Sequence, residues 1–287
     1  MIKIDRLLLI FILTAIIHLI DTLAYAVRLS GVSTKRLATA FSLFQIISLL
    51  ASTANLVQAP LLSSIVEQTI NSAMKDTLAV SQCLIQDPYY RQQLAVLSYQ
   101  IRLVIFSATV GTLVGVFFTP IFTFIFNRVI YMFEETGSVI RLVLILLSPR
   151  RLILLLYQSF SFLPKPKLYR RTIPLAFLIA NVIVIAFWTT GVLSSLYAGA
   201  LLPNYRSTAS LLSGVVNGIA TILSAIIINP TAAVITDHAL GGERKEEVKQ
   251  MVYYLCLTRI LGTILAQFIF IPSALLVKWV AILIIGL

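Results

Sequence analysis

The chain has 287 residues, of which 59% are hydrophobic and 11% are charged. Soluble domains carry roughly a quarter of charged residues, so this composition excludes a soluble enzyme, a secreted disulfide scaffold and a disordered chain. The net charge of +11 comes from 22 Lys and Arg residues against 11 Asp and Glu residues. Because the basic residues lie between apolar runs, they indicate membrane orientation and contact with anionic membrane lipids, and we expect no nucleic-acid partner.

Six apolar runs approach the roughly 20 residues that an α-helix needs to cross a bilayer. They predict an all-α polytopic membrane protein with six transmembrane helices, at Leu7–Val27, Leu37–Val57, Leu103–Phe126, Ile173–Ala200, Ala209–Ile228 and Val252–Ile271. The apolar tail Ser273–Leu287 either continues the sixth helix past a kink at Pro272 or forms a seventh element. The first run is interpreted as a transmembrane helix and not as a cleaved signal sequence, because His18 and Asp21 lie inside it.

Two connecting segments are expected at the membrane interface. Ser63–Val80 is predicted to form an amphipathic helix. In residues 139–172, basic side chains interrupt an apolar stretch, which favours a basic interfacial segment, with a re-entrant segment as the alternative. Pro60 and Pro230 lie near the ends of the second and fifth spans, where they favour helix termination over a hinge.

The distribution of basic residues predicts that the amino terminus lies outside. Fourteen of the 22 Lys and Arg residues fall on the side that is then cytoplasmic, within residues 28–36, 128–171 and 244–249. A weak internal correspondence, such as Tyr25-Ala26 with Tyr197-Ala198, suggests two inverted three-helix repeats within a single transmembrane domain, with halves 1–138 and 139–287. The alternative is chance similarity between apolar helices.

The first helix carries an unusual polar stripe. His18, Asp21, Tyr25 and Arg28 are spaced three, four and three residues apart and fall on one helical face. Lipid cannot solvate Asp21, so this face must meet protein or water. We interpret Asp21 with His18 as a proton or cation coupling site, and Arg28 as a phosphate contact. The alternative is a His18–Asp21 pair that only holds helices together, with Arg28 extending to the interface.

Other helices carry polar seams of their own. The second has Gln45, Ser48, Ser52 and Asn55 at helical spacing, and the fifth has Asn217 among small and hydroxyl residues. One such seam commonly serves helix packing, but seams on several helices of one bundle suggest a hydrated cavity or groove. Gln45, Asn55 and Asn217 are therefore candidate substrate-binding residues.

The sixth helix places Arg259 and Gln267 on one face, and both are candidates for substrate binding. An intramembrane arginine binds best to a carboxylate or a phosphate. The alternatives for Arg259 are an ion pair with Asp21, contact with an anionic substrate, or both in turn if the substrate displaces Asp21.

The chain shows no motif of an enzyme. It has no phosphate-binding loop of the Gly-x-x-x-x-Gly-Lys-[Ser/Thr] type and no visible pairing of a nucleophile with a base. Cys83 and Cys256 lack metal-ligand spacing. We expect a transporter without an ATPase or hydrolase motif, and no cofactor or metal.

One long signature resembles a known family. His18-Leu-Ile-Asp21-Thr-Leu-Ala-Tyr25-Ala-Val-Arg28-Leu-Ser-Gly31-Val-Ser-Thr34 is similar to the opening of the Amj family, bacterial lipid II flippases named as alternates to MurJ, and so is Thr53-Ala-Asn55-Leu-Val-Gln58-Ala-Pro60. The resemblance implies a cell-wall function in peptidoglycan biosynthesis and cell shape. Lipid II, an undecaprenyl pyrophosphate with a disaccharide-pentapeptide, would cross from the inner to the outer leaflet of the bacterial cytoplasmic membrane.

The resemblance implies that arginines face the pyrophosphate and that the polar seams face the sugars. A homo-oligomer is a further expectation. The alternatives are a transporter of another polyprenyl- or phospholipid-linked substrate, and a non-transporting scaffold of envelope synthesis.

Overall fold

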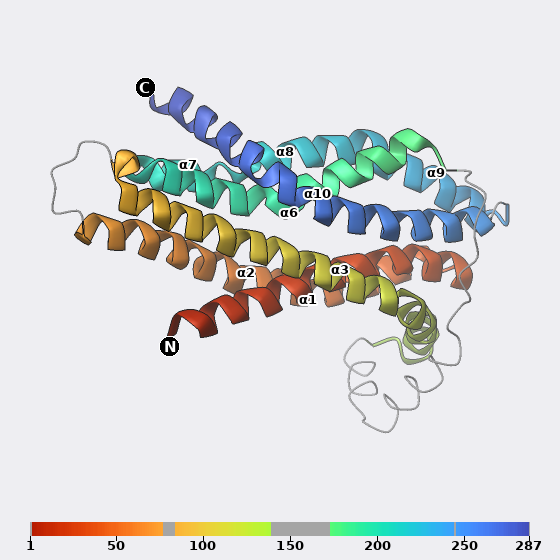
Figure 1. The fold of residues 1–287 in the computed structure, drawn as a ribbon. Helices are drawn as coiled ribbons and strands as arrows, with labels where there is room; N and C mark the ends of the chain where they lie inside the picture. Colours follow the sequence, from red (N-terminus) through yellow and green to blue (C-terminus); the bar gives the residue numbers. More distant parts are fainter. Residues whose placement is uncertain (1, 77–83, 139–172, 244, 287) are drawn as a thin grey trace.

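The computed structural model describes residues 2–76, 84–138, 173–243 and 245–286. Every regular element in these ranges is helical, and six helical segments are long and apolar enough to cross a membrane. The predicted six-span, all-α architecture is therefore confirmed. The long helices lie roughly along one axis, and both termini lie at the same end of the bundle, as an even number of crossings requires (Figure 1). The predicted interfacial segment 139–172 lies outside the described residues.

The amino-terminal half contains α1 (Ile2–Thr34), α2 (Leu37–Asp76) and α3 (Pro88–Thr136), with a short 3-10 turn, η1 (Leu84–Gln86), before α3. Helix α1 packs most extensively against α3 and also along α2. The turn between α1 and α2 is tight, with Lys35 in a left-handed conformation at φ 57°. Helix α1 is thus the central helix of this half.

The carboxy-terminal half contains α6 (Leu175–Leu201), a composite fifth span and α10 (Lys245–Ile285). The fifth span is built from short pieces, η2 (Pro203–Tyr205), α7 (Arg206–Leu211), α8 (Ser213–Leu223), the π-helical turn η3 (Ser224–Ile228) and α9 (Asn229–Leu240). Helix α6 packs against α10, α7 and α8, and it runs opposite to α1 along the bundle (Figure 1). The inverted repeat stays a prediction.

The expected termination of helices at proline is wrong. Pro60 lies inside α2, which continues to Asp76 in place of a separate amphipathic helix from Ser63. Pro230 follows the π-helical turn, after which the chain continues as α9. For the apolar tail the first alternative is confirmed, because Pro272 lies inside α10 and the tail continues the sixth helix. In lipid a broken helix exposes backbone groups that water cannot satisfy, which favours continuation of a helix past a proline. Next to Pro230 the helix adjusts locally through the π-helical turn η3.

Glycines bring the central helices close to their main partners. A Cβ atom at Gly111 would lie 2.1 Å from the carbonyl oxygen of Ala15, and one at Gly262 would lie 2.6 Å from Cβ of Ile185. The first contact joins α3 to α1, and the second joins α10 to α6. Small residues at helix interfaces permit such close van der Waals packing in membranes. Both halves therefore use the same packing device.

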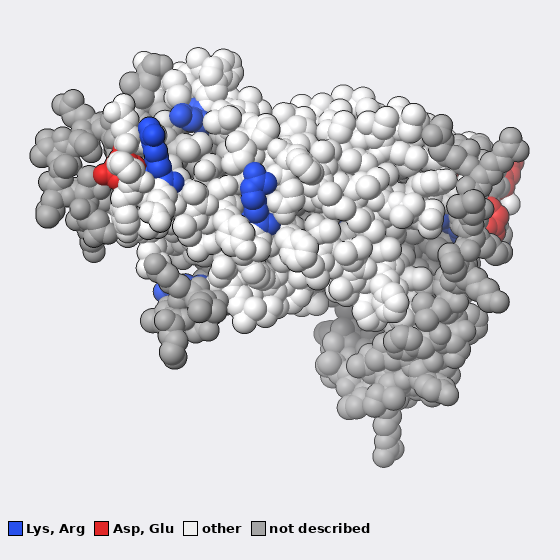
Figure 2. All heavy atoms as spheres, viewed as in Figure 1, with Lys and Arg blue, Asp and Glu red and all other residues white. Residues whose placement is uncertain are grey.

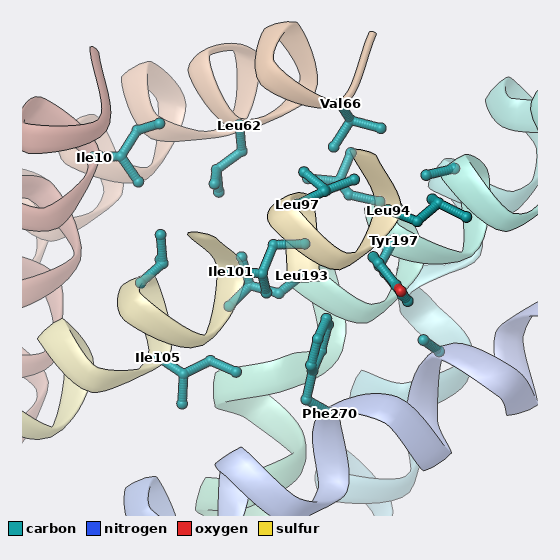
Figure 3. Close-up of a cluster of buried hydrophobic side chains, with 14 of the residues drawn as sticks. Ile10, Leu62, Val66, Leu94, Leu97, Ile101, Ile105, Leu193, Tyr197 and Phe270 are labelled. Carbon is teal, nitrogen blue, oxygen red and sulfur yellow. The ribbon is translucent and has the colours of Figure 1, made fainter. Parts of the chain in front are cut away.

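Much of the bundle interior is apolar, with a large cluster where α3, α6 and α10 meet. Ile101, Leu193 and Phe270 lie in this cluster (Figure 3). The outer surface is also rich in exposed large apolar side chains, such as Phe268 at 73% exposure. Most charged side chains on the face drawn in Figure 2 lie toward the two ends of the molecule. This distribution fits a bundle that lies in lipid along its middle.

Candidate functional site: a polar cavity inside the membrane

A cavity of about 360 Å³ lies between the two halves and is called the central cavity below. Helices α1, α2 and α6 supply most of its wall, and α3, α8 and α10 complete it. Polar side chains from five of these helices face it: Thr14, His18, Asp21, Ser52, Asn55, Gln58, Thr189, Asn217 and Arg259. The predicted convergence of polar groups from separate spans is confirmed.

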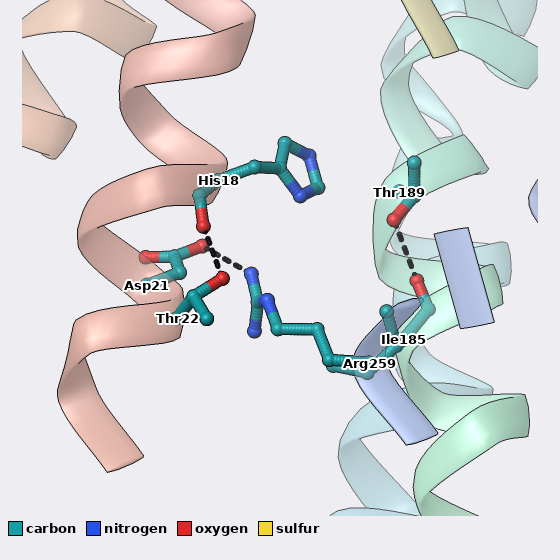
Figure 4. A network of polar contacts seen from close by, with 6 residues as sticks. All are labelled: His18, Asp21, Thr22, Ile185, Thr189 and Arg259. Atoms are coloured by element: carbon teal, nitrogen blue, oxygen red, sulfur yellow. Dashed lines mark hydrogen bonds and ion pairs between the residues drawn. The ribbon is translucent and has the colours of Figure 1, made fainter. Parts of the chain in front are cut away.

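An ion pair between the two halves lies in this cavity. Nη2 of Arg259 on α10 donates to Oδ2 of Asp21 on α1 at 3.2 Å (Figure 4). The arginine side chain is 7% exposed and the aspartate side chain is 48% exposed. The guanidinium also lies over the ring of Tyr25, at 5.8 Å from its centroid. The described contacts of Asp21 thus pair it with Arg259 and not with His18.

Packing around the pair fixes both helices. On α10, Thr258 precedes Arg259 and accepts a hydrogen bond from Nδ2 of Asn181 on α6 at 2.8 Å. On α1, the hydroxyl of Thr22 donates to the carbonyl of His18 at 2.6 Å. A Cβ atom at Gly115 of α3 would lie 2.7 Å from Cβ of Thr22, so α3 approaches α1 closely here. The ion pair therefore joins two helices that neighbours already hold in place.

The cavity is closed on one side and open on another. Its lining residues from α3, Val104 and Ala108, are fully buried. Ser52 and Asn55 of α2 are exposed, and Trp188 of α6 is 46% exposed. These exposed residues lie well inside the membrane-spanning helices. The cavity therefore opens sideways, along α2 and α6, into the region that lipid occupies.

Three of the predicted site residues lie outside the central cavity. Arg28 lies over the ring of Phe41, at 5.4 Å from its centroid, and Gln45 is exposed on α2. Gln267 joins α10 to α3: its amide donates to the carbonyl of Arg102 at 2.9 Å, and the guanidinium of Arg102 donates to the carbonyl of Gln267 at 2.6 Å. The structure brings together only Arg259, Asp21, His18, Asn55 and Asn217.

Sequence reasoning missed three polar residues of the cavity wall, Thr14, Gln58 and Thr189. The amide of Gln58 on α2 donates to the hydroxyl of Thr14 on α1, and both side chains are buried. Thr14 lies four residues before His18, and Gln58 lies three residues after Asn55. Both therefore continue the stripes that were recognised, and extending each stripe by one turn would have found them.

These features define an integral membrane protein with a charged, laterally open cavity between its first three and its last three spans. The model of the Amj family, described as alternate to MurJ, matches residues 13–281. The chain is also 33% identical over 282 residues to a protein of Bacillus subtilis (strain 168) named lipid II flippase Amj, with 96% of each chain covered. The chain belongs to the Amj family, and the predicted family is confirmed. No solved structure matches the chain.

Proposed function

We propose that this chain is a lipid II flippase, which moves the lipid-linked peptidoglycan precursor from the inner to the outer leaflet of the bacterial cytoplasmic membrane. The observation that carries the proposal is the laterally open polar cavity with its Asp21–Arg259 pair, in a chain of the Amj family. The relative named lipid II flippase Amj supports the choice of substrate.

The shape of the cavity suits a lipid with a large polar headgroup. A sugar pyrophosphate cannot cross hydrocarbon without polar partners, and the central cavity supplies them inside the membrane. Its sideways opening lets a polyprenyl tail stay in lipid while the headgroup enters. At about 360 Å³, the cavity is near the lower end of ligand pockets, which span about 300–1,000 Å³. Passage of a disaccharide-pentapeptide therefore requires the two halves to move apart.

We assign substrate binding to Arg259, Asn55 and Asn217, which face the cavity from α10, α2 and α8. Asp21 with His18 is assigned to proton or cation coupling, because the half-exposed carboxylate of Asp21 is accessible from the cavity. The structure gives no support to substrate binding by Arg28, Gln45 or Gln267, because all three lie outside the cavity. Contact with anionic lipids and self-association stay predictions.

We also propose that the amino terminus lies outside. Both termini share one end of the bundle, so the opposite end, with the α1–α2 and α9–α10 turns, is then cytoplasmic (Figure 1). A cysteine introduced at Gly241, in the exposed turn after α9, tests this in a variant without native cysteines. We expect labelling by an impermeant maleimide only after the cells are opened, and labelling in intact cells would reverse the orientation.

The function is tested in a bacterium depleted of its known lipid II flippases. We expect expression of this chain alone to restore outer-leaflet lipid II and growth. The negative control is the Arg259→Gln variant at equal abundance, which is expected to fold but not to transport. Restoration of growth without outer-leaflet lipid II, or no restoration by an abundant, folded chain, would contradict the proposal.

A further inference from the structure

The guanidinium of Arg259 is buried but incompletely hydrogen-bonded. Its Nη2 makes one contact to Asp21 at 3.2 Å, and its Nε has no hydrogen-bond partner among the described residues. A guanidinium carries five N–H donors, and charge-assisted bonds are typically about 2.7–2.9 Å long. Arg259 also hydrogen-bonds to the side chain of Tyr25, but Asp21, at a long 3.2 Å, is its one anionic partner among the described residues. This buried cation is therefore short of anionic acceptors.

The two partners of the ion pair are held very differently. The Arg259 side chain is 7% exposed, whereas the Asp21 side chain is 48% exposed and lies on the cavity side. Releasing the half-exposed carboxylate costs little free energy, whereas leaving the buried guanidinium without an anion costs much more. Asp21 can thus leave only if another anion takes its place on Arg259.

Two further cavity residues have buried atoms without a partner in the described part of the chain. These atoms are Nδ1 of His18 and Oδ1 of Asn217. Figure 4 shows the guanidinium of Arg259 next to Asp21, and the imidazole of His18 extending into the space between α1 and α6. Oδ1 of Asn217 lies against Gly191 of α6, where an added Cβ atom would be 2.0 Å away. Nε of Arg259 only donates and an imidazole nitrogen does either, so an anionic acceptor in the cavity satisfies both.

We propose that Arg259 exchanges Asp21 for a phosphate oxygen of a polyprenyl-linked sugar pyrophosphate. In the exchanged state His18 donates through Nδ1 to the same anion. Asp21 is then an internal anion that occupies the site between substrates, and its release leaves a carboxylate free for the coupling cation or proton. The identity of the lipid rests on the proposed function, while the anion site rests on the geometry of Arg259.

The exchange is tested by binding to the purified full chain in phosphatidylcholine nanodiscs. The probes are undecaprenyl pyrophosphate, undecaprenol as the phosphate-free lipid, and inorganic pyrophosphate as the free anion. Hydrogen bonds to charged groups are worth about 1.5–3 kcal/mol, which converts to tenfold or more in affinity. We expect Arg259→Gln to weaken undecaprenyl pyrophosphate at least roughly tenfold and to leave undecaprenol unchanged. Asp21→Asn removes the competing anion and is expected to tighten undecaprenyl pyrophosphate about tenfold.

Matched variants separate this effect from misfolding. Arg36 pairs with Glu134 outside the cavity, so Arg36→Gln is expected to leave all three affinities unchanged. Arg259→Lys keeps the charge, and the double variant Asp21→Asn, Arg259→Gln removes both charges of the pair, so one of them is expected to fold if Arg259→Gln does not. The double variant is expected to bind undecaprenyl pyrophosphate as weakly as the Arg259→Gln variant does.

Weaker or unchanged binding by a folded Asp21→Asn variant would overturn the exchange. Failure of the wild-type chain to bind either pyrophosphate would overturn the site itself. Binding of inorganic pyrophosphate with the same dependence on Arg259 would support the anion site and show that the free anion suffices. Binding is measured without transport, so this test is independent of the proposed function. If the chain shows the predicted affinities but fails to restore outer-leaflet lipid II, the anion site stands and the flippase function is contradicted.

Discussion

Replacing Gly111 by alanine tests whether close packing of α1 on α3 sets the geometry of the cavity. The added Cβ atom would lie 2.1 Å from the carbonyl oxygen of Ala15, and ordinary contacts begin at 3.4 Å. The obstructing atom belongs to the backbone, so no side-chain rotation relieves the clash. Helices α1 and α3 must therefore separate by about 1.3 Å, as the difference between those two distances gives.

Overpacking of this kind costs typically about 1–3 kcal/mol. Ala15 lies less than one turn before His18 and under two turns before Asp21. The displacement of α1 therefore also moves both residues relative to Arg259 on α10. Misplacement of binding groups by about 1 Å can reduce activity about a hundredfold, so we expect Gly111→Ala to lose most lipid II translocation as well as stability.

The chain offers a matched control in a second glycine pair. Gly214 and Gly218 of α8 have the same spacing as Gly111 and Gly115, but a Cβ atom at either would meet no atom within 4 Å. Gly214→Ala is therefore expected to keep wild-type stability. The assay is thermal unfolding of the purified chain together with complementation in flippase-depleted cells. Equal melting temperatures and equal translocation for Gly111→Ala and Gly214→Ala would refute the reasoning.

Three further variants, and one control variant, test other contacts. Tyr90→Phe removes the hydroxyl that donates to the carbonyl of Ala200 at 2.6 Å and is expected to cost about 0.6 kcal/mol, a usual value between membrane helices. Thermal unfolding measures this loss, and a loss of translocation at full stability would contradict a purely structural role. Gln58→Leu removes the α1–α2 hydrogen bond in the cavity wall and is expected to cost about 1 kcal/mol and to reduce translocation. The control Thr53→Val, on the exposed face of α2, is expected to change neither stability nor translocation. Equal effects of Gln58→Leu and Thr53→Val would argue against a role for the cavity wall. Arg102→Gln breaks the link from α3 to α10 and is expected to lower the melting temperature while pyrophosphate affinity stays unchanged, so a loss of that affinity in the folded variant would place Arg102 in the site.

The sequence predicted the architecture well because hydropathy and helical spacing carry that information. Six apolar runs became six spans, and the stripe containing His18 and Asp21 did turn toward a cavity. Element ends were less predictable. Pro60 suggested a helix end by local rules, yet it lies inside the continuous helix α2. The low dielectric of the membrane favours unbroken backbone hydrogen bonding, and local propensity does not report this.

The membership of the cavity was only partly predictable. Helical spacing placed Arg28 on the stripe of Asp21, but about two turns further along α1 that stripe leaves the cavity and meets Phe41 of α2. Gln267 shares a face with Arg259, yet its amide is used in contacts to the backbone of α3. Which helix lies opposite a given turn depends on tertiary packing, and one sequence does not specify it.

The central claim is that Arg259 in the central cavity contacts the headgroup while lipid II crosses the membrane. It is tested most directly by lipid II translocation in vesicles that contain only the purified chain, comparing wild type, Arg36→Gln and Arg259→Gln at equal folded amounts. Wild type and Arg36→Gln are expected to translocate lipid II at similar rates, and Arg259→Gln is expected to be at the level of protein-free vesicles. Wild-type translocation by a folded Arg259→Gln chain would show that the headgroup takes another route.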